Sequence, residues 1–414
     1  MSKNPDPRLV SSLAVISGIP AGESGTGRLI AHLETGIAEL LGGRVKLISR
    51  PQLPALWHIL FLLRSKTLRQ TVLEFVRQLI FVCKFWLSVG QVLLINRRKL
   101  VLLHPQSLGF PLALRLLETR REPAIFYLLD SSFFCVASYN KLPGENGACL
   151  RCLDLGFDQI VQNGRKPFPR LDPKAVHFAR RLQKMVKEGR VKVVAQNLRQ
   201  AELAQRHFAL ASLPSVVGLW TKDWDEILLD KAGLAGGETT PAEYSFDVLF
   251  HGHCLDAKGA VWTAELAAHC PELRFMFPFS KPDWLESRAN CFFVPCTWET
   301  GLRDALVRSR YVIVPSLWSA PIEGALVKSI ASARAVIVVD NPTSFSDELP
   351  NGLLVKLSGS LPDAAAELRH AIASDWRPDP AVKTLWLADF AKVHSVFLRR
   401  LLAETLHGVP KEST

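Results

Sequence analysis

The chain repeats one pattern twice, in which short and strongly apolar runs alternate with stretches whose apolar residues are spaced for a helix. Continuous apolar runs are typical of strands buried on both faces of a parallel sheet, and intervening helices are the usual crossover connections. The first half contains LAVIS at 13–17, RVKLIS at 44–49, LVLLH at 100–104, AIFYLL at 124–129 and VKVVAQ at 191–196. The second half contains FDVLFHG, LRFMFPF, CFFVP, RYVIVPS and AVIVVD, between 246 and 340. The sequence therefore predicts an α/β protein with two similar halves, each built on a parallel sheet.

A stretch of small residues with Gly, Thr and Pro at 232–244 separates the two halves and is predicted to be a linker. We accordingly expect an N-terminal domain over 1–235 and a C-terminal domain over 245–383. The last periodic segment, 384–406, has no strand after it. It is expected to form a helix that packs across both domains, within a final region of 384–414.

Composition narrows the classes of partner. The chain has 414 residues, 48% of them hydrophobic, and a formal net charge of +11, so it can bury a large core and favours an anionic partner. The opening MSKNPDPRLV lacks the features of a secretory signal, which leads us to expect a cytoplasmic protein. A pI of about 9.4 also raises nucleic-acid binding, but no zinc finger or RNA-binding aromatic signature is present, so no nucleic-acid partner is expected.

Residues 56–99 depart from the pattern, because they are strongly apolar yet contain eight basic side chains and the single acid Glu74. No uncharged apolar stretch of about 18 residues occurs, which argues against a membrane-spanning helix. On a helix, the polar residues Gln70, Glu74, Arg77, Lys84, Ser88 and Gln91 fall on one narrow stripe. Two interpretations stay open: a largely buried helix with its stripe toward solvent, or an interfacial helix on anionic lipid. The flanking cations favour the second, which predicts peripheral attachment to the inner face of the cell membrane. The basic residues are Arg64, Lys66, Arg69, Arg77, Lys84, Arg97, Arg98 and Lys99.

A glycine-rich segment, SGIPAGESGTGR at 17–28, lies between the first apolar run and a helical stretch. Glycines let backbone N–H groups approach a ligand, and the following helix N-terminus favours an anion. Arg28 and Leu29 stand where a Walker A loop needs Lys and then Ser or Thr, which argues against an ATPase or GTPase. No clean G-x-G-x-x-G with a later acidic residue is present, which argues against a dinucleotide enzyme. A purely structural turn remains the alternative.

A lysine occupies a similar place in the second half. Lys258 and Gly259 lie where the loop after FDVLFHG meets the next helical stretch. A cation beside a helix N-terminus at the carboxyl end of a strand is well placed to bind a diphosphate, because the ammonium and the helix dipole act on the same anion. A solvated surface lysine is the alternative interpretation.

The segment RYVIVPSLWSAPIEGALVKSIASARAVIVVD at 310–340 resembles the donor-site region of family 4 glycosyltransferases. The glycine-rich loop, His104, Asp130 and the Lys258-Gly259 pair occur in the order found in that family. The resemblance implies the GT-B fold, with two Rossmann-like domains facing a central cleft and a C-terminal helix crossing back. It also implies metal-independent transfer of a sugar, with retention, from a nucleotide-sugar to a glycan, lipid-linked or polysaccharide acceptor. The donor-binding residues that it implies are Gly25, Thr26, Gly27, His253, Lys258, Gly259, Ser319, Gly324 and Lys328.

The sequence also departs from the family pattern. The two glutamates that the family has around the last loop and helix are replaced by Ala320 and Lys328, and Glu323 between them is a possible substitute acid or a helix cap. Where the family has Gly-Arg before the lysine, this sequence has Gly252-His253. Where the family has a His-Asp pair in the N-terminal domain, this sequence has Leu129-Asp130. The candidate catalytic residues are therefore Asp130, His104 and Glu323. A catalytically silent subunit that binds glycan or supports a partner enzyme stays open as the second hypothesis.

Three cysteines raise a separate question. Cys149 and Cys152 form a C-x-x-C pair, and Cys135 lies 14 residues before the first of them. Such thiols could hold a structural zinc ion, but a fourth ligand is not identified. Thiols that are reduced and bind no metal are the favoured interpretation. No D-x-D motif is evident, and no cofactor beyond the nucleotide-sugar substrate is expected.

Overall fold

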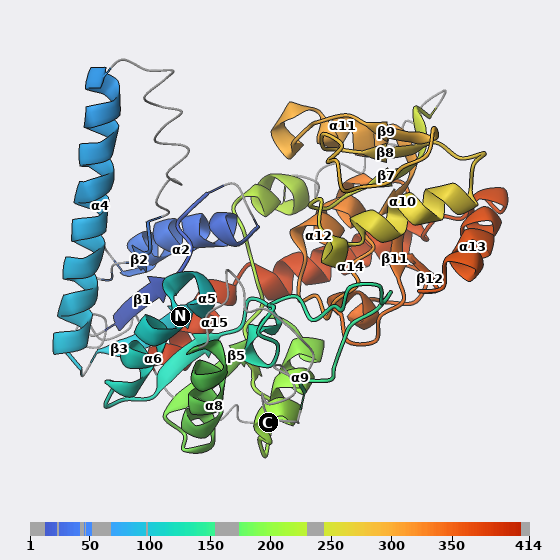
Figure 1. Ribbon diagram of the computed structural model, residues 1–414. Helices are drawn as coiled ribbons and strands as arrows, with labels where there is room; N and C mark the ends of the chain where they lie inside the picture. Colours follow the sequence, from blue (N-terminus) through green and yellow to red (C-terminus); the bar gives the residue numbers. More distant parts are fainter. Residues whose placement is uncertain are drawn as a thin grey trace.

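The computed structural model describes residues 13–22, 25–41, 45, 47–51, 68–96, 98–153, 174–229 and 244–406. The described residues form two domains, each built on a parallel sheet with helices on both faces (Figure 1). The predicted linker at 232–244 lies almost entirely outside the described residues. Among the described residues, no helix is long and apolar enough to cross a membrane.

The N-terminal sheet has six strands in the order β2-β1-β3-β4-β5-β6, all parallel. β1 is buried along its whole length, as its continuous apolar run predicts. Five strands correspond to the predicted apolar runs, and the sixth, of two residues, was not predicted. The strands are β1 (Leu13–Ser17), β2 (Leu47–Ser49), β3 (Lys99–Leu103), β4 (Ala124–Tyr127), β5 (Val191–Ala195) and β6 (Ser215–Val216).

Helices cover both faces of this sheet. One buried cluster joins a face of the sheet to the C-terminal part of α4 and to α6, α8 and α9, and the other face packs on α2 and α15. The bounds are α2 (Gly25–Leu41), α4 (Leu68–Leu94), α5 (Pro105–Leu108), α6 (Phe110–Glu118), α8 (Lys174–Lys187) and α9 (Leu198–Phe208). Two short helices, η1 (Ser131–Phe133) and η2 (Asp225–Leu229), lie in the connections.

The C-terminal sheet also has six parallel strands, in the order β12-β11-β10-β7-β8-β9. Its strands are β7 (Phe246–Phe250), β8 (Phe275–Phe277), β9 (Cys291–Phe293), β10 (Ser309–Ile313), β11 (Val336–Val339) and β12 (Val355–Leu357). The longer helices between them are α10 (Ala260–His269), α11 (Leu302–Val307), α12 (Gly324–Ser332) and α13 (Leu361–Ala373). The shorter ones are η4 (Asp256–Lys258), η5 (Trp298–Thr300) and η6 (Phe345–Glu348).

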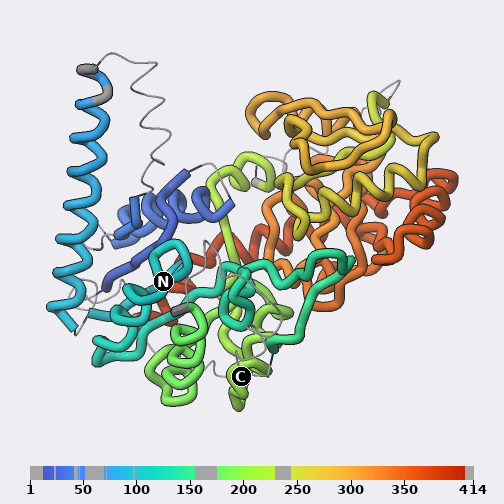
Figure 2. Tube along the Cα trace, viewed as in Figure 1, coloured from blue at the N-terminus to red at the C-terminus, as the bar shows by residue number. Residues whose placement is uncertain are grey.

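The C-terminal segment returns to the N-terminal domain. It forms two helices rather than the single one expected over 384–406, namely α14 (Pro380–His394) and α15 (Phe397–Leu406). α14 contacts α12, whereas α15 contacts α2, β3 and β4. The tube in Figure 2 shows this red segment running from the second domain to beneath the first. Glu404 of α15 forms an ion pair with Lys192 of β5, which anchors the returning helix.

One hydrophobic cluster is continuous between the two domains. It runs from the α2 side of the first sheet to the α12 side of the second, and aromatic residues of the connecting segments lie in its middle. Trp220 and Trp224 make an edge-to-face contact, and both rings pack near Phe390 of α14. Since the carboxyl ends of both sets of strands lie next to this shared core, the loops that follow them form the surface between the domains.

Candidate functional site

Lys258 lies between the domains in a buried ion pair. It ends η4, two residues before α10 begins, and its ammonium group pairs with the carboxylate of Glu323. The same ammonium lies 4.7 Å from the ring centre of Trp318. Gly259 has a φ of +78°, and a Cβ there would lie 2.2 Å from the Pro315 carbonyl oxygen, so the turn into α10 requires glycine. The candidate donor cation is therefore held rigidly at the carboxyl end of β7.

Glu323 occupies the N-cap position of α12, but its side chain accepts no capping hydrogen bond. Its carboxylate is directed to Lys258 instead. Gly324 begins α12, where an added Cβ would meet only Trp224, at 3.9 Å. Glu323 is therefore adjacent to the candidate diphosphate cation, whereas Ala320 is an apolar, buried residue of the same loop.

A loop of the N-terminal domain covers this ion pair. Residues 131–153 follow β4 and reach the second domain, as the teal segment of Figure 1 shows. The Tyr139 ring meets Trp318 edge-on, with centroids 4.6 Å apart. Asn140 is fully buried; its amide donates to Ser319 Oγ at 2.8 Å, and its carbonyl oxygen accepts from the Ser319 backbone N–H at 2.9 Å. Lys141 pairs with Asp256 at 2.5 Å. Ser319 is thus a point of contact between the domains.

A second ionic cluster surrounds Lys328. Its ammonium pairs with Asp223 of the segment that connects the domains and lies 4.6 Å from the Trp298 ring centre. Asp223 also accepts from Arg28 at 2.6 Å, and Arg28 bonds Glu299 at 2.9 Å. Burial raises the pKa of Asp223, but its bonds with Lys328 and Arg28 outweigh that effect, and the net pKa lies below the ordinary value. The charge of Lys328 is therefore neutralised within the protein.

His251 lies next to this cluster. Its ring is stacked on Trp298 and its Nδ1 lies 2.8 Å from Ser329 Oγ. Burial, together with the charge of Lys328, lowers the pKa of His251 to about 3. The imidazole is consequently neutral throughout the physiological pH range. His253, two residues later, is exposed, and it is not part of this stack.

His104 and Asp130 come together in the N-terminal domain, at the carboxyl ends of β3 and β4. His104 Nε2 lies 3.9 Å from Asp130 Oδ2. Gln106 donates to both Asp130 oxygens at 3.1 and 3.0 Å, and the Ser132 backbone N–H donates to Oδ1 at 2.8 Å. Burial lowers the pKa of His104 despite the nearby carboxylate, and its buried Nδ1 makes no hydrogen bond with the described residues. The pair is a neutral imidazole beside a carboxylate that accepts several hydrogen bonds from the protein. Such an arrangement can orient a hydroxyl group.

The glycines of the first loop have different local environments. A Cβ on Gly18 would lie 2.2 Å from the His104 carbonyl oxygen, and one on Gly27 would lie 2.9 Å from Gly22. A Cβ on Gly25 would meet nothing within 4 Å. Gly25, Thr26 and Gly27 form the first turn of α2, and Glu23 and Ser24 lie outside the described residues. Close packing explains Gly18 and Gly27, whereas Gly25 has space beside it.

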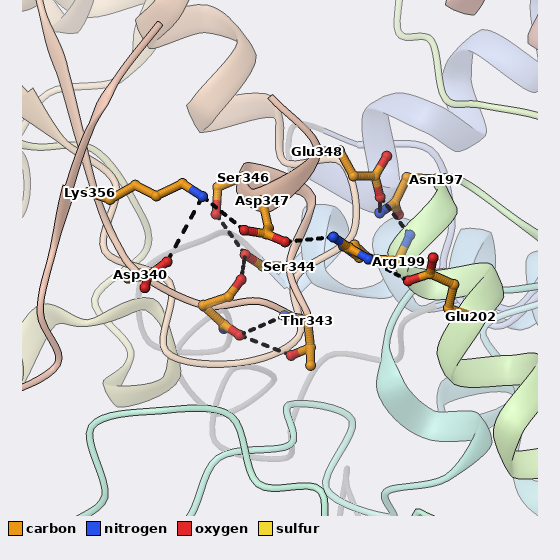
Figure 3. A network of polar contacts seen from close by, with 11 residues as sticks. Asn197, Arg199, Glu202, Asp340, Thr343, Ser344, Ser346, Asp347, Glu348 and Lys356 are labelled. Carbon is orange, nitrogen blue, oxygen red and sulfur yellow. Dashed lines mark hydrogen bonds and ion pairs between the residues drawn. The ribbon is translucent and has the colours of Figure 1, made fainter. Parts of the chain in front are cut away.

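A further polar network joins the domains at the end of β5 (Figure 3). Glu348 of η6 accepts from Asn197 Nδ2 at 2.5 Å and from the Arg199 backbone N–H at 2.6 Å, at the N-terminus of α9. Arg199 also bonds Asp347 at 2.8 Å, and Asp347 pairs with Lys356 at 2.8 Å. Burial raises the pKa of Glu348 against the opposing effect of these donors. A carboxylate of the second domain therefore occupies the capping position of a helix in the first.

The three cysteines of the zinc hypothesis, Cys135, Cys149 and Cys152, are all buried. Within the described ranges, no three or more His, Cys, Asp and Glu side chains are grouped as metal ligands. Asn140 lies in the same segment and bonds the Cys149 backbone. The backbone carbonyl of Asn140 accepts from the Cys149 N–H at 2.5 Å, and its side-chain amide donates to the Cys149 carbonyl at 3.2 Å. The structure thus supplies no ligand set for zinc, and the zinc hypothesis stays a prediction for metal analysis.

The predicted residues therefore do not form one group. Besides Gly25–Gly27 in the first turn of α2 and the exposed His253, they form three groups. Lys258, Gly259, Glu323, Gly324 and Ser319 lie together, Lys328 lies in the Asp223 cluster, and His104 and Asp130 form the third group. Sequence reasoning missed several of their partners. Gln106 had a signal, because it lies two residues after His104 at the end of the same strand. Asp223, Tyr139 and Asn140 had none, since they belong to connections without a recognisable motif.

No protein-family profile matches the chain, and no curated protein does. Solved structures do match it. Sucrose-phosphate synthase from Thermosynechococcus elongatus is 13% identical, with a TM-score of 0.59, and the match covers 96% of this chain and 99% of that one. Anabaena HepE in complex with UDP is 12% identical, with a TM-score of 0.52 and coverages of 96% and 100%. Trehalose-6-phosphate synthase from Burkholderia multivorans is 13% identical, with a TM-score of 0.52 and coverages of 96% and 98%.

These similarities extend over nearly the whole chain and concern its fold. Together with the two parallel six-stranded sheets and the returning C-terminal helices, they confirm the predicted architecture. The chain has the GT-B fold of glycosyltransferases.

Proposed function

We propose that this protein is a glycosyltransferase that moves a sugar from a nucleotide-sugar to a glycan, lipid-linked or polysaccharide acceptor, with retention and without a catalytic metal. The observation that carries the proposal is the buried Lys258–Glu323 pair at the N-terminus of α10, between the domains of a GT-B fold. Anabaena HepE has been solved with UDP and with UDP-glucose, and it shares this fold. A nucleoside diphosphate carrying a sugar is therefore the class of donor that we propose.

In this proposal the ammonium of Lys258 neutralises the leaving diphosphate, helped by the N-terminal amides of α10. The amides of Gly25 to Gly27 and of Gly324 hydrogen-bond donor oxygens from the two domains. His104 and Asp130 orient a sugar or acceptor hydroxyl. Glu323, which neutralises Lys258 before the donor arrives, turns to the sugar once the diphosphate has taken its place.

We further propose that the protein works in the cytoplasm, attached peripherally to the inner face of the cell membrane. This location suits a lipid-linked acceptor, and the net charge of +11 suits an anionic surface.

The donor proposal is tested with a panel of nucleotide-sugars and a matched pair of variants. A bound donor raises the apparent melting temperature of the folded protein. With the best donor found, we expect Lys258→Ala to weaken binding by about 2–4 kcal/mol, the usual cost of removing one partner of a buried charged contact. Lys192→Ala is the control, because it removes a lysine that is also ion-paired, with Glu404 of α15, but near the start of β5 and not at the carboxyl ends of the strands.

Equal donor affinities for the wild type and Lys258→Ala would contradict the assignment of the donor site. A loss of similar size in Lys192→Ala would show that the effect is structural rather than local. Calorimetric titration at constant ionic strength separates these outcomes. It measures the affinity directly, and the fitted number of sites shows what fraction of the protein still binds.

A second candidate function is a catalytically silent GT-B subunit. The observation that favours it is the pair formed by Lys328 and Asp223 at the place of a family glutamate, together with the apolar Ala320 at the other. Such a subunit would bind glycan or support a partner enzyme. Detectable hydrolysis of, or transfer from, any nucleotide-sugar would exclude it.

A further inference from the structure

Helix α4 exposes a continuous apolar face. In Figure 1 it stands at the edge of the N-terminal domain that is furthest from the second sheet. Its outward face, as we define it, consists of Leu73, Val76, Leu79, Ile80, Trp86 and Leu87, which are between 44% and 69% exposed. Their spacings of three, four and seven residues place them along one side of the helix. The interpretation of this segment as a largely buried helix is therefore wrong for α4.

The opposite side of α4 explains how the helix is held. Phe85, Val89 and Val92 are buried in the core cluster of the first sheet, and all three lie in the C-terminal half of the helix. A helix of 27 residues is about 40 Å long, so roughly half of it extends past this anchorage. The outward face, which begins at Leu73, therefore extends well before Phe85, the first α4 residue buried in this cluster.

The charges beside the outward face are positive. Arg77 and Lys84 lie seven residues apart and are exposed along one edge of that face. Glu74 is the single acid of the helix; it is half-buried and accepts a hydrogen bond from Gln78 at 2.9 Å. The surface is thus an apolar strip bordered by cations, and no exposed acid on α4 is available to neutralise them.

We propose that the outward face of α4 lies in the plane of an anionic lipid bilayer, with its apolar side chains among the acyl chains and Arg77 and Lys84 at the headgroups. This inference rests on the proposed membrane location and names the surface responsible for it. Large exposed apolar strips with a cationic border are the pattern of interfacial helices. A second copy of the chain would bring the same cations together without an acid to pair with them.

The test uses two leucines of nearly equal exposure. Leu87 on α4 is 69% exposed and Leu385 on α14, away from the outward face, is 65% exposed. Leu87→Glu should weaken binding to vesicles of phosphatidylcholine with phosphatidylglycerol at least about tenfold, the effect of losing one buried leucine. Leu385→Glu adds the same charge and should leave vesicle binding unchanged. Binding should also fall as salt is raised, because the attraction of Arg77 and Lys84 is screened.

Cys83 supplies a direct probe, since it is exposed in the middle of the outward face. With Cys254, Cys291 and Cys296 replaced by Ser, a polarity-sensitive fluorophore on Cys83 should shift to the blue when anionic vesicles are added. A blue shift that depends on protein concentration without vesicles would overturn the proposal in favour of self-association. Absent vesicle binding, or equal loss in both leucine variants, would also overturn it. Titration of Leu87→Glu with the donor distinguishes the membrane proposal from the donor-site proposal. Donor binding should be unaffected by this substitution, whether or not vesicle binding is lost.

Discussion

At the scale of single residues, the decisive feature is that each candidate cation of the interdomain surface already has an acidic partner. Lys258 pairs with Glu323, and Lys328 pairs with Asp223. A diphosphate that binds Lys258 must therefore compete with an internal carboxylate. Such competition lowers affinity for the anion but keeps the empty site from holding an uncompensated buried charge.

This competition makes Glu323→Gln informative. Removing the charge of Glu323 should tighten the binding of a free nucleoside diphosphate about tenfold, because Lys258 is then no longer neutralised. If Glu323 contacts the sugar, the matching nucleotide-sugar should gain less than the free diphosphate. Calorimetric titration with both ligands checks the prediction. Unchanged affinity for the free diphosphate would mean that Lys258 does not bind it.

At the scale of elements, the loop between β1 and α2 combines two kinds of glycine. Gly18 lies against the backbone at His104 and Leu108, whereas Gly25 has open space beside it. The first is required by packing and the second is not. A glycine-rich composition alone does not distinguish these two roles.

We therefore expect opposite results from two alanine substitutions in this loop. Gly18→Ala should lower the free energy of unfolding by more than about 2 kcal/mol, because backbone must move to admit the methyl group. Gly25→Ala should leave stability unchanged or raise it by up to about 1 kcal/mol, since alanine is the better helix former. Chemical denaturation measures both. A Gly25→Ala protein that is stable but binds donor more weakly would place the donor at this helix turn, and similar destabilisation of both variants would contradict the contacts described.

At the scale of the whole molecule, the two domains are joined by a shared hydrophobic core and by polar contacts away from it. Asn140 bonds Ser319, and Glu348 caps α9 across the interface. These contacts add to the shared hydrophobic core in fixing the arrangement of the domains. Ligands that bind between the domains act on this arrangement.

Glu348→Ala should loosen the observed arrangement of the domains. The substitution removes the acceptor of Asn197 Nδ2 and of the Arg199 N–H, at a cost of about 1.5–3 kcal/mol for hydrogen bonds to a charged group. Small-angle scattering should then show a larger radius of gyration. Arg369→Ala is the control, because it removes an exposed ion pair with Glu272 inside one domain. An unchanged radius of gyration for Glu348→Ala would show that the hydrophobic core alone sets the arrangement.

Much of the fold could be predicted because it depends on local patterns. Apolar runs such as LAVIS and AVIVVD became central strands, since continuous burial on both faces is required there. β6 and β12 were not predicted, because neither contains a run of consecutive buried apolar residues. The segment 56–99, of which α4 is the described helix, was recognised as unusual. Its period fits both a buried and an interfacial helix, and only the packing of α4 shows which side is exposed.

The candidate site was predictable only in part. The position of Lys258 followed from its place after a strand, because strand-loop-helix units put such residues at the cleft edge of a sheet. Its partner did not follow, since Glu323 is 65 residues away in the chain. Likewise, Arg28 and Asp223 are separated by 195 residues.

The sequence by itself determined two α/β domains, a cation at the carboxyl end of β7 and an apolar, basic helix, because hydrophobic period and strand-to-helix junctions are local properties. Only the tertiary structure decided which charges neutralise one another, which glycines are tightly packed and which face of α4 is left uncovered. These properties depend on segments that are distant in the chain and meet only in the folded protein, and on burial, which strengthens a contact between charges only once water has been excluded.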